Sequence, residues 1–296
     1  MNAPVGSPWQ RLALLAVALA AGGCARDGQA ARPPGPMAST IVGLAADLGA
    51  TPAEAADSLR RADEIAARVR DRHARGHGGD WIADLNAVVF DQLGFEREIA
   101  SQDVRFFRLP SVIAQRRGSC LGLGALYLVL AERLGVGLDG VMVPGHFFVR
   151  TREPVARNIE LLRRGESMPD AWYRTKYGPW PDGSPGSPGS PGSPGYPYLR
   201  PLAPAEVAAV HWYNAGNHLR GAHDLAGAAV AYQRAAAALP AFAEAQASLG
   251  AVRQLAGALD DAEAAYRQAA RVRPDLPGLD RNLALLKQER VTRDTE

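Results

Sequence analysis

The sequence is poor in cysteine and balanced in charge. Its 296 residues include only two cysteines, Cys24 and Cys120, which excludes a disulfide-rich scaffold and a zinc site built on several thiolates. Lysine and arginine total 33 against 31 aspartates and glutamates, a net charge of +2. So small an excess forms no basic stripe, and nucleic acid is therefore not expected as a partner. A hydrophobic fraction of 47% is ordinary for one or two globular domains.

The N-terminal apolar run is too short to span a membrane. A positive charge precedes residues 12–21, a run about half as long as the ~20 residues needed to cross a bilayer, so residues 1–23 are expected to be a signal peptide. Cys24 follows Ala-Gly-Gly and resembles the acylated cysteine of a bacterial lipobox. Ala21 stands where leucine is usual in that motif, and cleavage after Ala20 is the alternative. The sequence predicts an exported, membrane-anchored lipoprotein of the cell envelope, at the periplasmic face or outer membrane.

The rest of the chain divides by composition. Residues 24–38 contain Arg-Pro-Pro-Gly-Pro and predict an extended tether. Residues 39–204 mix helical patterns with short β-rich runs, and Gly-Ser-Pro repeats at 183–195 are interpreted as a solvated loop inserted there, too short for a collagen helix. Residues 205–290 are helical in pattern throughout. An α+β domain followed by an all-α segment is therefore expected.

A long amphipathic helix is expected near the start of the α+β domain. Thr51-Pro-Ala-Glu54 reads as a capping box with proline at the first helical position, beginning a helix from about Pro52 to Arg75. His73 and His77 lie four residues apart near its end, a spacing that metal ligands use. No third ligand accompanies them, so we expect solvated side chains and no metal site.

The most informative stretch surrounds the second cysteine and reads RRGSCLGLGALYLVLAERLG. From Leu121 its apolar pattern is that of a helix buried on most sides, which places Cys120 in the first turn. Unpaired backbone amides and the helix dipole favour the thiolate there. Glycine is unfavourable in a helix, and three glycines here indicate close approach of another backbone or of a substrate. These are Gly118, Gly122 and Gly124.

A β-rich run, VMVPGHFFVR, follows at residues 141–150 and carries His146 directly after Pro-Gly. Alternation along this run turns the histidine away from its core-facing neighbours. A second short run, from Val155 to Leu161, carries Asn158 and Glu160 two residues apart and therefore on one face. A nucleophile at a helix N-terminus, a base on a strand and an orienting group on the next strand suit a thiolate–imidazolium pair.

These segments together resemble the transglutaminase-like branch of the papain-like thiol superfamily. The similarity lies in RRGSCLGLGALYLVLAERLG, VMVPGHFFVR and RNIELLRRGE, with weaker support from LNAVVFDQLGF, and covers roughly residues 39–204. The resemblance implies a papain/transglutaminase-like fold with a helical N-terminal part, Cys120 as nucleophile and His146 as general base. The third member is usually Asp or Asn. Glu160 is the first choice for it here, and Asn158 is the alternative.

The same resemblance suggests how an oxyanion would be bound. Gln115, five residues before the cysteine, is a candidate donor, since glutamine has this role in papain-like enzymes. A surface glutamine is the alternative, with the amides of Cys120 and its neighbours as the donors. The implied chemistry is acyl transfer or hydrolysis at an amide, with no metal or cofactor. A non-catalytic lipoprotein scaffold with a degenerate thiol site is the alternative function.

The C-terminal segment repeats with a period of 34 residues from Ala209 onward. The first repeat's Trp212, Gly216, Ala228, Tyr232, Ala235 and Pro240 correspond to Gln246, Gly250, Ala262, Tyr266, Ala269 and Pro274. Small residues that let paired helices touch, and a proline that ends the second helix, resemble the tetratricopeptide pattern. We expect two repeats and a capping helix from Leu279 to Gln288, packed on the preceding domain. Their function is expected to be either a groove for a protein or peptide partner or a helical buttress.

Overall fold

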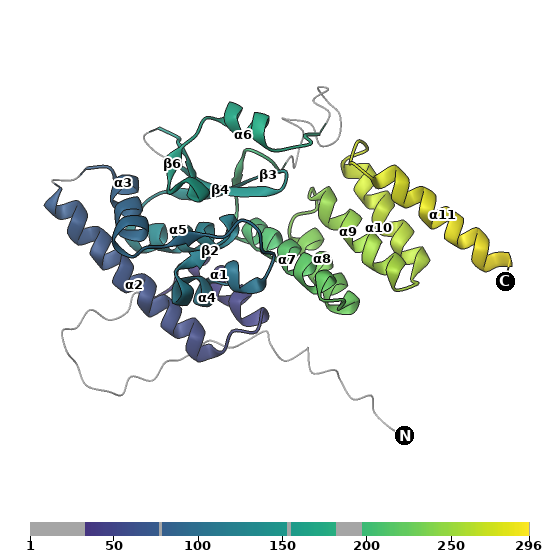
Figure 1. The fold of residues 1–296 in the computed structure, drawn as a ribbon, viewed down its shortest axis with the longest axis horizontal. Coiled ribbons are helices and arrows are strands. Elements are labelled where there is room, and N and C mark those ends of the chain that lie inside the picture. Colours follow the sequence, from purple (N-terminus) through teal and green to yellow (C-terminus); the bar gives the residue numbers. More distant parts are fainter. Residues whose placement is uncertain (1–32, 77–78, 153–154, 182–196, 296) are drawn as a thin grey trace, which may run out of the picture. The chain divides into compact units, whose positions relative to one another are not determined.

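The computed structural model describes residues 33–76, 79–152, 155–181 and 197–295 (Figure 1). The predicted signal peptide, the lipidation site Cys24 and the Gly-Ser-Pro insertion lie outside these residues. Strands and helices mix up to Leu202, and only helices follow, so the predicted α+β class with an all-α C-terminal segment is confirmed. None of the helices in the described ranges is both long and apolar enough to cross a membrane.

The mixed part places helices around one antiparallel sheet. Its helices are α1 (Pro36–Asp47), α2 (Pro52–Arg75), α3 (Trp81–Asn86), η2 (Ala87–Gln92), η3 (Val104–Phe106), α4 (Leu109–Gln115), α5 (Cys120–Leu134), η4 (Leu161–Arg163) and α6 (Asp170–Lys176). The sheet has the order β6-β5-β4-β3-β7, with β3 (Leu138–Val143), β4 (His146–Thr151), β5 (Asn158–Glu160), β6 (Glu166–Ser167) and β7 (Pro201–Leu202). A separate parallel pair joins β1 (Glu96–Arg97) to β2 (Arg117–Gly118).

Helix α2 begins as its capping box predicts, whereas α1 begins inside the predicted tether. The Thr51 side chain accepts from the Glu54 amide, and the Glu54 carboxylate accepts from the Thr51 amide at 2.7 Å. At the start of α1, the carboxylate of Glu132 accepts from the amides of Met37 at 3.1 Å and Ala38 at 2.9 Å. The tether was therefore predicted a few residues too long. Pro36 at the first position of α1 is a local signal, but the capping carboxylate comes from Glu132 of α5, far along the chain.

His73 is tied to α3 rather than solvated. Its Nδ1 lies 2.8 Å from Asp84 Oδ2, and its ring stacks on Trp81 with centroids 3.5 Å apart. Its predicted companion His77 lies outside the described residues. Within the part of the chain that the structure covers, no three His, Cys, Asp or Glu side chains are arranged to hold a metal ion. His73 is a packing residue between two helices.

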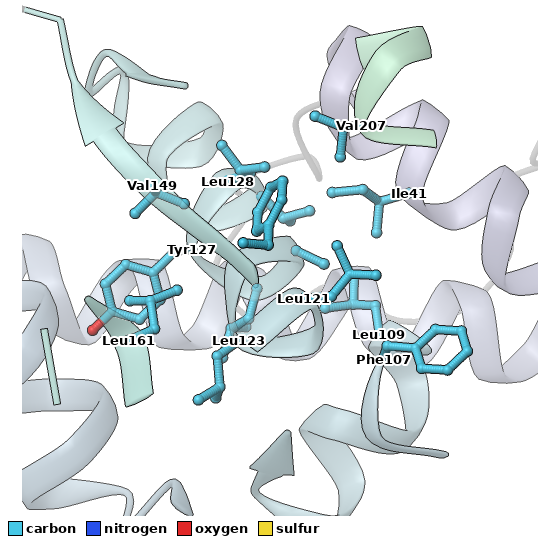
Figure 2. Close-up of a cluster of buried hydrophobic side chains, with 14 of the residues drawn as sticks. Ile41, Phe107, Leu109, Leu121, Leu123, Tyr127, Leu128, Val149, Leu161 and Val207 are labelled. Carbon is cyan, nitrogen blue, oxygen red and sulfur yellow. The ribbon is translucent and has the colours of Figure 1, made fainter. Parts of the chain in front are cut away.

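Helix α5 forms the centre of the hydrophobic core, buried on most sides as its sequence predicts. Figure 2 shows Leu121, Leu123, Tyr127 and Leu128 of α5 beside Val149 of β4. The helix also packs against α1, α2 and α4. Its position matters for function because α5 begins at Cys120.

The β3–β4 hairpin presents His146 at its turn. Val143 pairs with His146 across a two-residue turn, Pro144-Gly145, in which Gly145 has φ of 72°, a conformation that favours glycine. The sequence predicts one core-facing side for this strand, but both sides are buried. Helix α6, which no sequence pattern predicts, covers the face of Phe148, and α5 covers the other (Figure 1).

The C-terminal region consists of two pairs of consecutive helices that pack on each other, followed by one more helix. Its helices are α7 (Pro204–Gly221), α8 (Leu225–Ala238), α9 (Ala243–Leu255), α10 (Leu259–Val272) and α11 (Leu279–Thr295). A Cβ on Gly216 would lie 2.6 Å from the ring of Tyr232, and a Cβ on Gly250 would lie 2.6 Å from that of Tyr266. The same glycine–tyrosine contact thus recurs at the 34-residue spacing, between α7 and α8 and again between α9 and α10.

His211 of α7 predicts a loss of stability in acid. Its side chain is 2% exposed, its Nδ1 donates to the Val207 carbonyl at 3.0 Å, and burial lowers its pKa to about 4. The unfolded chain takes up this proton near pH 6.5, before the folded chain does. The free energy of unfolding should therefore fall between about pH 6.5 and 4, by up to about 3 kcal/mol from this residue.

Urea unfolding at about pH 7 and about pH 4.5 measures this effect. The variant His211→Met should lose less stability across the interval than the wild-type chain does. Leu249→Met, a change in the helical core that removes no titratable group, provides the control and should leave the pH dependence unchanged. An equal acid-induced loss in wild type and His211→Met would contradict the prediction.

Candidate thiol site

Cys120 is the first residue of α5, and its position is fixed by the residue before it. The Ser119 hydroxyl donates to the Phe106 carbonyl at 3.1 Å and accepts from the Gly122 amide at 3.3 Å. A Cβ on Gly122 would collide with that same carbonyl, so glycine is needed for this loop to approach the helix. The thiol is half-buried and borders a pocket. It stands at the helix terminus where free amides and the dipole favour an anion.

His146 and Glu160 form a buried pair next to this thiol. His146 Nε2 lies 2.7 Å from Glu160 Oε2, and the two residues are 6% and 1% exposed. The second carboxylate oxygen of Glu160 accepts from the Leu162 amide at 3.0 Å. The Tyr177 ring stacks on the imidazole with centroids 4.3 Å apart and planes 2° from parallel. The carboxylate and the tyrosine together leave the imidazole little freedom to rotate.

The charge state of His146 follows from these neighbours. Burial alone would lower its pKa, but hydrogen bonding and charge from Cys120 and Glu160 outweigh burial and raise the pKa to about 9. The imidazole is therefore protonated at neutral pH, with Nε2–H donating to Glu160 and Nδ1–H left for the cysteine side. Burial, followed by the charge of Glu160, raises the pKa values of Tyr173 and Tyr177, so both remain neutral hydroxyls.

Asn158 shares a strand face with Glu160 but does not reach the imidazole. Its Oδ1 accepts from Arg150 Nε at 2.6 Å, and its Nδ2 donates to Asp170 Oδ1 at 2.7 Å. The register of β5 against β4 explains this, because it places Asn158 opposite Arg150 and not beside His146. Glu160 lies two residues further along β5, toward the end of β4 that carries His146. The structure thus brings Glu160 to the histidine and uses Asn158 to anchor α6.

Gln115 lies away from the thiol. It is the exposed last residue of α4 and is not among the residues that line the pocket. A different glutamine, Gln102, borders the pocket together with Cys120. The amides of Cys120 and Leu121 at the start of α5 have no partner within their own helix. They are the donors best placed for an oxyanion formed at the cysteine.

A pocket of about 450 Å³ opens beside the thiol and extends to the C-terminal helices. Its near wall is the thiol site and the β3–β4 turn, and its far wall comes from α7, α9 and the segment after α10. The far wall comprises Val210, Tyr213, Asn214, Asn217, Phe242, Glu244, Arg273, Leu276 and Pro277. A pocket of this size and mixed lining is ordinary for a small-molecule or peptide site.

Several of these residues were missed in the sequence. Trp172 and Tyr173 lie in the short helix α6 and Tyr177 directly follows it, and these aromatic residues have no clear period, so no sequence pattern predicts the contact with His146. Asn214 and Asn217 did leave one, because asparagine is unfavourable inside a helix and two occur within α7. Asparagine inside a helix therefore indicates a side chain with specific hydrogen bonds, and both of these side chains make them.

Comparison with known proteins identifies the domain that carries the site. Residues 56–173 match the family model described as the Transglutaminase-like superfamily. Two curated relatives, each named UPF0162 protein, come from the Temecula1 and 9a5c strains of Xylella fastidiosa. Each is 37% identical over 70 residues, which are 23% of this chain and 25% of the relative, so the match spans about a quarter of their length. Residues 56–173 thus form a transglutaminase-like domain.

Proposed function

We propose that this protein is a cysteine-dependent acyltransferase or hydrolase that acts on an amide or peptide substrate. The observation that carries the proposal is the 2.7 Å contact between His146 Nε2 and Glu160, in a buried pair whose other ring nitrogen is left for Cys120. The transglutaminase-like domain at residues 56–173 supports it. The half-buried thiol on an open pocket gives a substrate carbonyl access to sulfur.

In the proposed mechanism the Cys120 thiolate attacks the carbonyl carbon, and a C–S bond forms. The oxyanion is held by the amides at the start of α5. The His146 imidazolium gives its Nδ1 proton to the leaving amine as the C–N bond breaks, which leaves a thioester. Water or a second amine then attacks the thioester, His146 accepts its proton, and the thiolate departs. Glu160 orients the ring and stabilises its charged form throughout.

We also propose a location and a role for the remaining parts of the chain. Acylation of Cys24 would hold the protein at an envelope membrane, as the N-terminal sequence suggests. The helical C-terminal region is proposed to be a pair of tetratricopeptide repeats that bind a protein or peptide. The glycine–tyrosine contacts recurring at Gly216 and Gly250 support this reading, because small residues let paired helices touch in such repeats.

Alkylation of the thiol tests the proposed chemistry. Iodoacetamide should label Cys120 of the folded protein at about pH 6 much faster than it labels the thiol of free cysteine, because a thiolate beside an imidazolium is the reactive form. His146→Ala should slow this labelling by roughly tenfold or more, since the imidazolium no longer stabilises the thiolate. The rate is measured by mass spectrometry of a Cys24→Ser chain, so that Cys120 is the only thiol.

The alternative function, a non-catalytic scaffold, predicts a different result. Labelling would then be as slow as that of an ordinary thiol and independent of His146. As a control, His73→Ala alters a histidine that contacts Asp84 and Trp81 and should leave the labelling rate unchanged. Slow labelling of a correctly folded wild-type chain would refute the proposed activity.

A further inference from the structure

The far wall of the pocket carries carboxamide groups that the proposed acyl-transfer steps do not use. Asn214 and Asn217 lie three residues apart on α7, both half-buried and both lining the pocket that begins at Cys120. Residues at this spacing share one side of a helix. The C-terminal region therefore shares the space into which the thiol opens.

The two asparagines present complementary groups. Asn214 Nδ2 donates to the Val210 carbonyl at 2.9 Å, so its Oδ1 is the group left to accept. Asn217 Oδ1 accepts from the Tyr232 hydroxyl at 2.7 Å, so its Nδ2 is the group left to donate. Tyr213 also interacts with Asn217, but Nδ2 carries two hydrogens and one remains. An acceptor and a donor on one helix side match the N–H and C=O groups of an extended polypeptide.

The charges of the far wall cancel one another. Arg273 Nη1 donates to Glu244 Oε1 at 2.7 Å, and Tyr198 also binds this carboxylate. The other Arg273 amino group donates to the Pro179 carbonyl at 2.9 Å, which ties the C-terminal region to the segment that follows Tyr177. Among the described residues that line the pocket, the cationic side chains are Arg273 and the His146 imidazolium, and they are paired with Glu244 and Glu160, so neither is free to bind a phosphate or other anion. A neutral ligand fits it best.

We infer that the C-terminal helices and the thiol bind one and the same molecule, a neutral extended peptide segment. Its reactive carbonyl lies at Cys120, while its backbone amide groups pair with Asn214 and Asn217. The inference rests on the proposed acyl-transfer function and names its substrate class. It makes α7 part of the substrate site, so that the helical region selects what the thiol acts on.

Peptide vinyl sulfones test this inference, because they alkylate a thiol only after binding beside it. An acetylated Ala-Ala-Gly vinyl sulfone should inactivate the wild-type chain with saturable kinetics. Asn214→Ala and Asn217→Asp should each raise the half-saturating concentration by about tenfold, the effect of one lost hydrogen bond. Asn217→Asp keeps an acceptor for Tyr232 but removes both Nδ2 hydrogens, including the one used by Tyr213, and adds a negative charge. Asn282→Ala on α11, outside the pocket, is the matched control and should have no effect.

An ester analogue of the probe identifies the contact itself. In this analogue an ester oxygen replaces the peptide N–H that donates to Asn214 Oδ1. The replacement should weaken binding about tenfold in the wild-type chain and not at all in Asn214→Ala. Iodoacetamide, which needs no such contacts, should label all these chains at rates within about twofold of one another. Unchanged saturation in both asparagine variants, or protection of Cys120 by a neutral oligosaccharide but not by peptides, would overturn the inference while leaving the thiol chemistry standing. Slow, His146-independent alkylation by iodoacetamide would instead refute the proposed function.

Discussion

Replacing Glu160 by glutamine is expected to lower the rate of acyl transfer by about a hundredfold at about pH 8, the effect of a misplaced or wrongly protonated acid–base group. Glutamine preserves the shape of the side chain and can still accept from the Leu162 amide. It removes the negative charge that lies 2.7 Å from His146 Nε2. The imidazole then keeps its burial but loses one of the two groups that hold its proton, and its pKa must fall.

Because the pKa of His146 falls in Glu160→Gln, the difference in rate should be seen in a defined pH range. In the wild-type chain His146 is protonated up to about pH 9 and can protonate a leaving amine. In Glu160→Gln the midpoint of the His146 titration moves below pH 9. The rates of the two chains should therefore differ most between that new midpoint and pH 9, and should become similar in acid, where His146 is protonated in both. NMR titration of the histidine Cε1–H signals, assigned with His146→Ala, measures the midpoint directly.

A surface carboxylate provides the control for this experiment. Glu166→Gln on the neighbouring strand β6 removes an exposed charge paired with Arg163 and should change neither rate nor titration. Circular dichroism confirms that both variants are folded. If His146 of Glu160→Gln still titrates near 9 and the rate is unchanged, Glu160 does not hold the imidazolium and the proposed triad is wrong.

The sequence predicts elements whose causes are local. The capping box at Thr51 begins α2 as expected, because its donors and acceptors lie within one helical turn. The α+β class followed from periodicity for the same reason. The predicted tether, residues 24–38, overlaps the start of α1 at Pro36, whose capping carboxylate, Glu132, lies far along the chain. Contacts between residues far apart in the chain produce no periodic pattern in the sequence.

The same distinction explains the site. Helix and strand patterns place Cys120 at a helix start and His146 on a strand, since each depends on its own neighbours. The choice between Asn158 and Glu160 depends on the register of β5 against β4, which is set by the connection between them and not by alternation. Tyr177, which stacks on the imidazole, comes from a segment after α6 whose position only the folded chain defines.

Gly124→Ala is expected to slow reaction at Cys120 by up to about a hundredfold, although it changes no polar group. A Cβ at Gly124 would lie 2.5 Å from Cε1 of Phe147. The ring is also close to the backbone of Gly140 on β3, where an added Cβ would lie 2.6 Å from Cζ, so it has little room to shift toward that strand. Helix α5 must therefore move away from β4. Since Gly124 is one turn after Cys120 and Phe147 directly follows His146, this movement separates the thiol from the imidazole.

The change in unfolding free energy of Gly124→Ala distinguishes a steric clash from the usual stabilisation of a helix by alanine. Overpacking should cost about 1–3 kcal/mol of unfolding free energy, more than the gain of about 1 kcal/mol that alanine brings to a helix interior. At Gly43 of α1 a Cβ would meet nothing within 4 Å, so Gly43→Ala should stabilise the chain and leave the thiol rate unchanged. Adding Phe147→Leu to Gly124→Ala should restore much of the rate, because the smaller side chain makes room for the methyl group. Additive losses in the double variant would show that the Gly124–Phe147 contact does not set the distance from sulfur to imidazole.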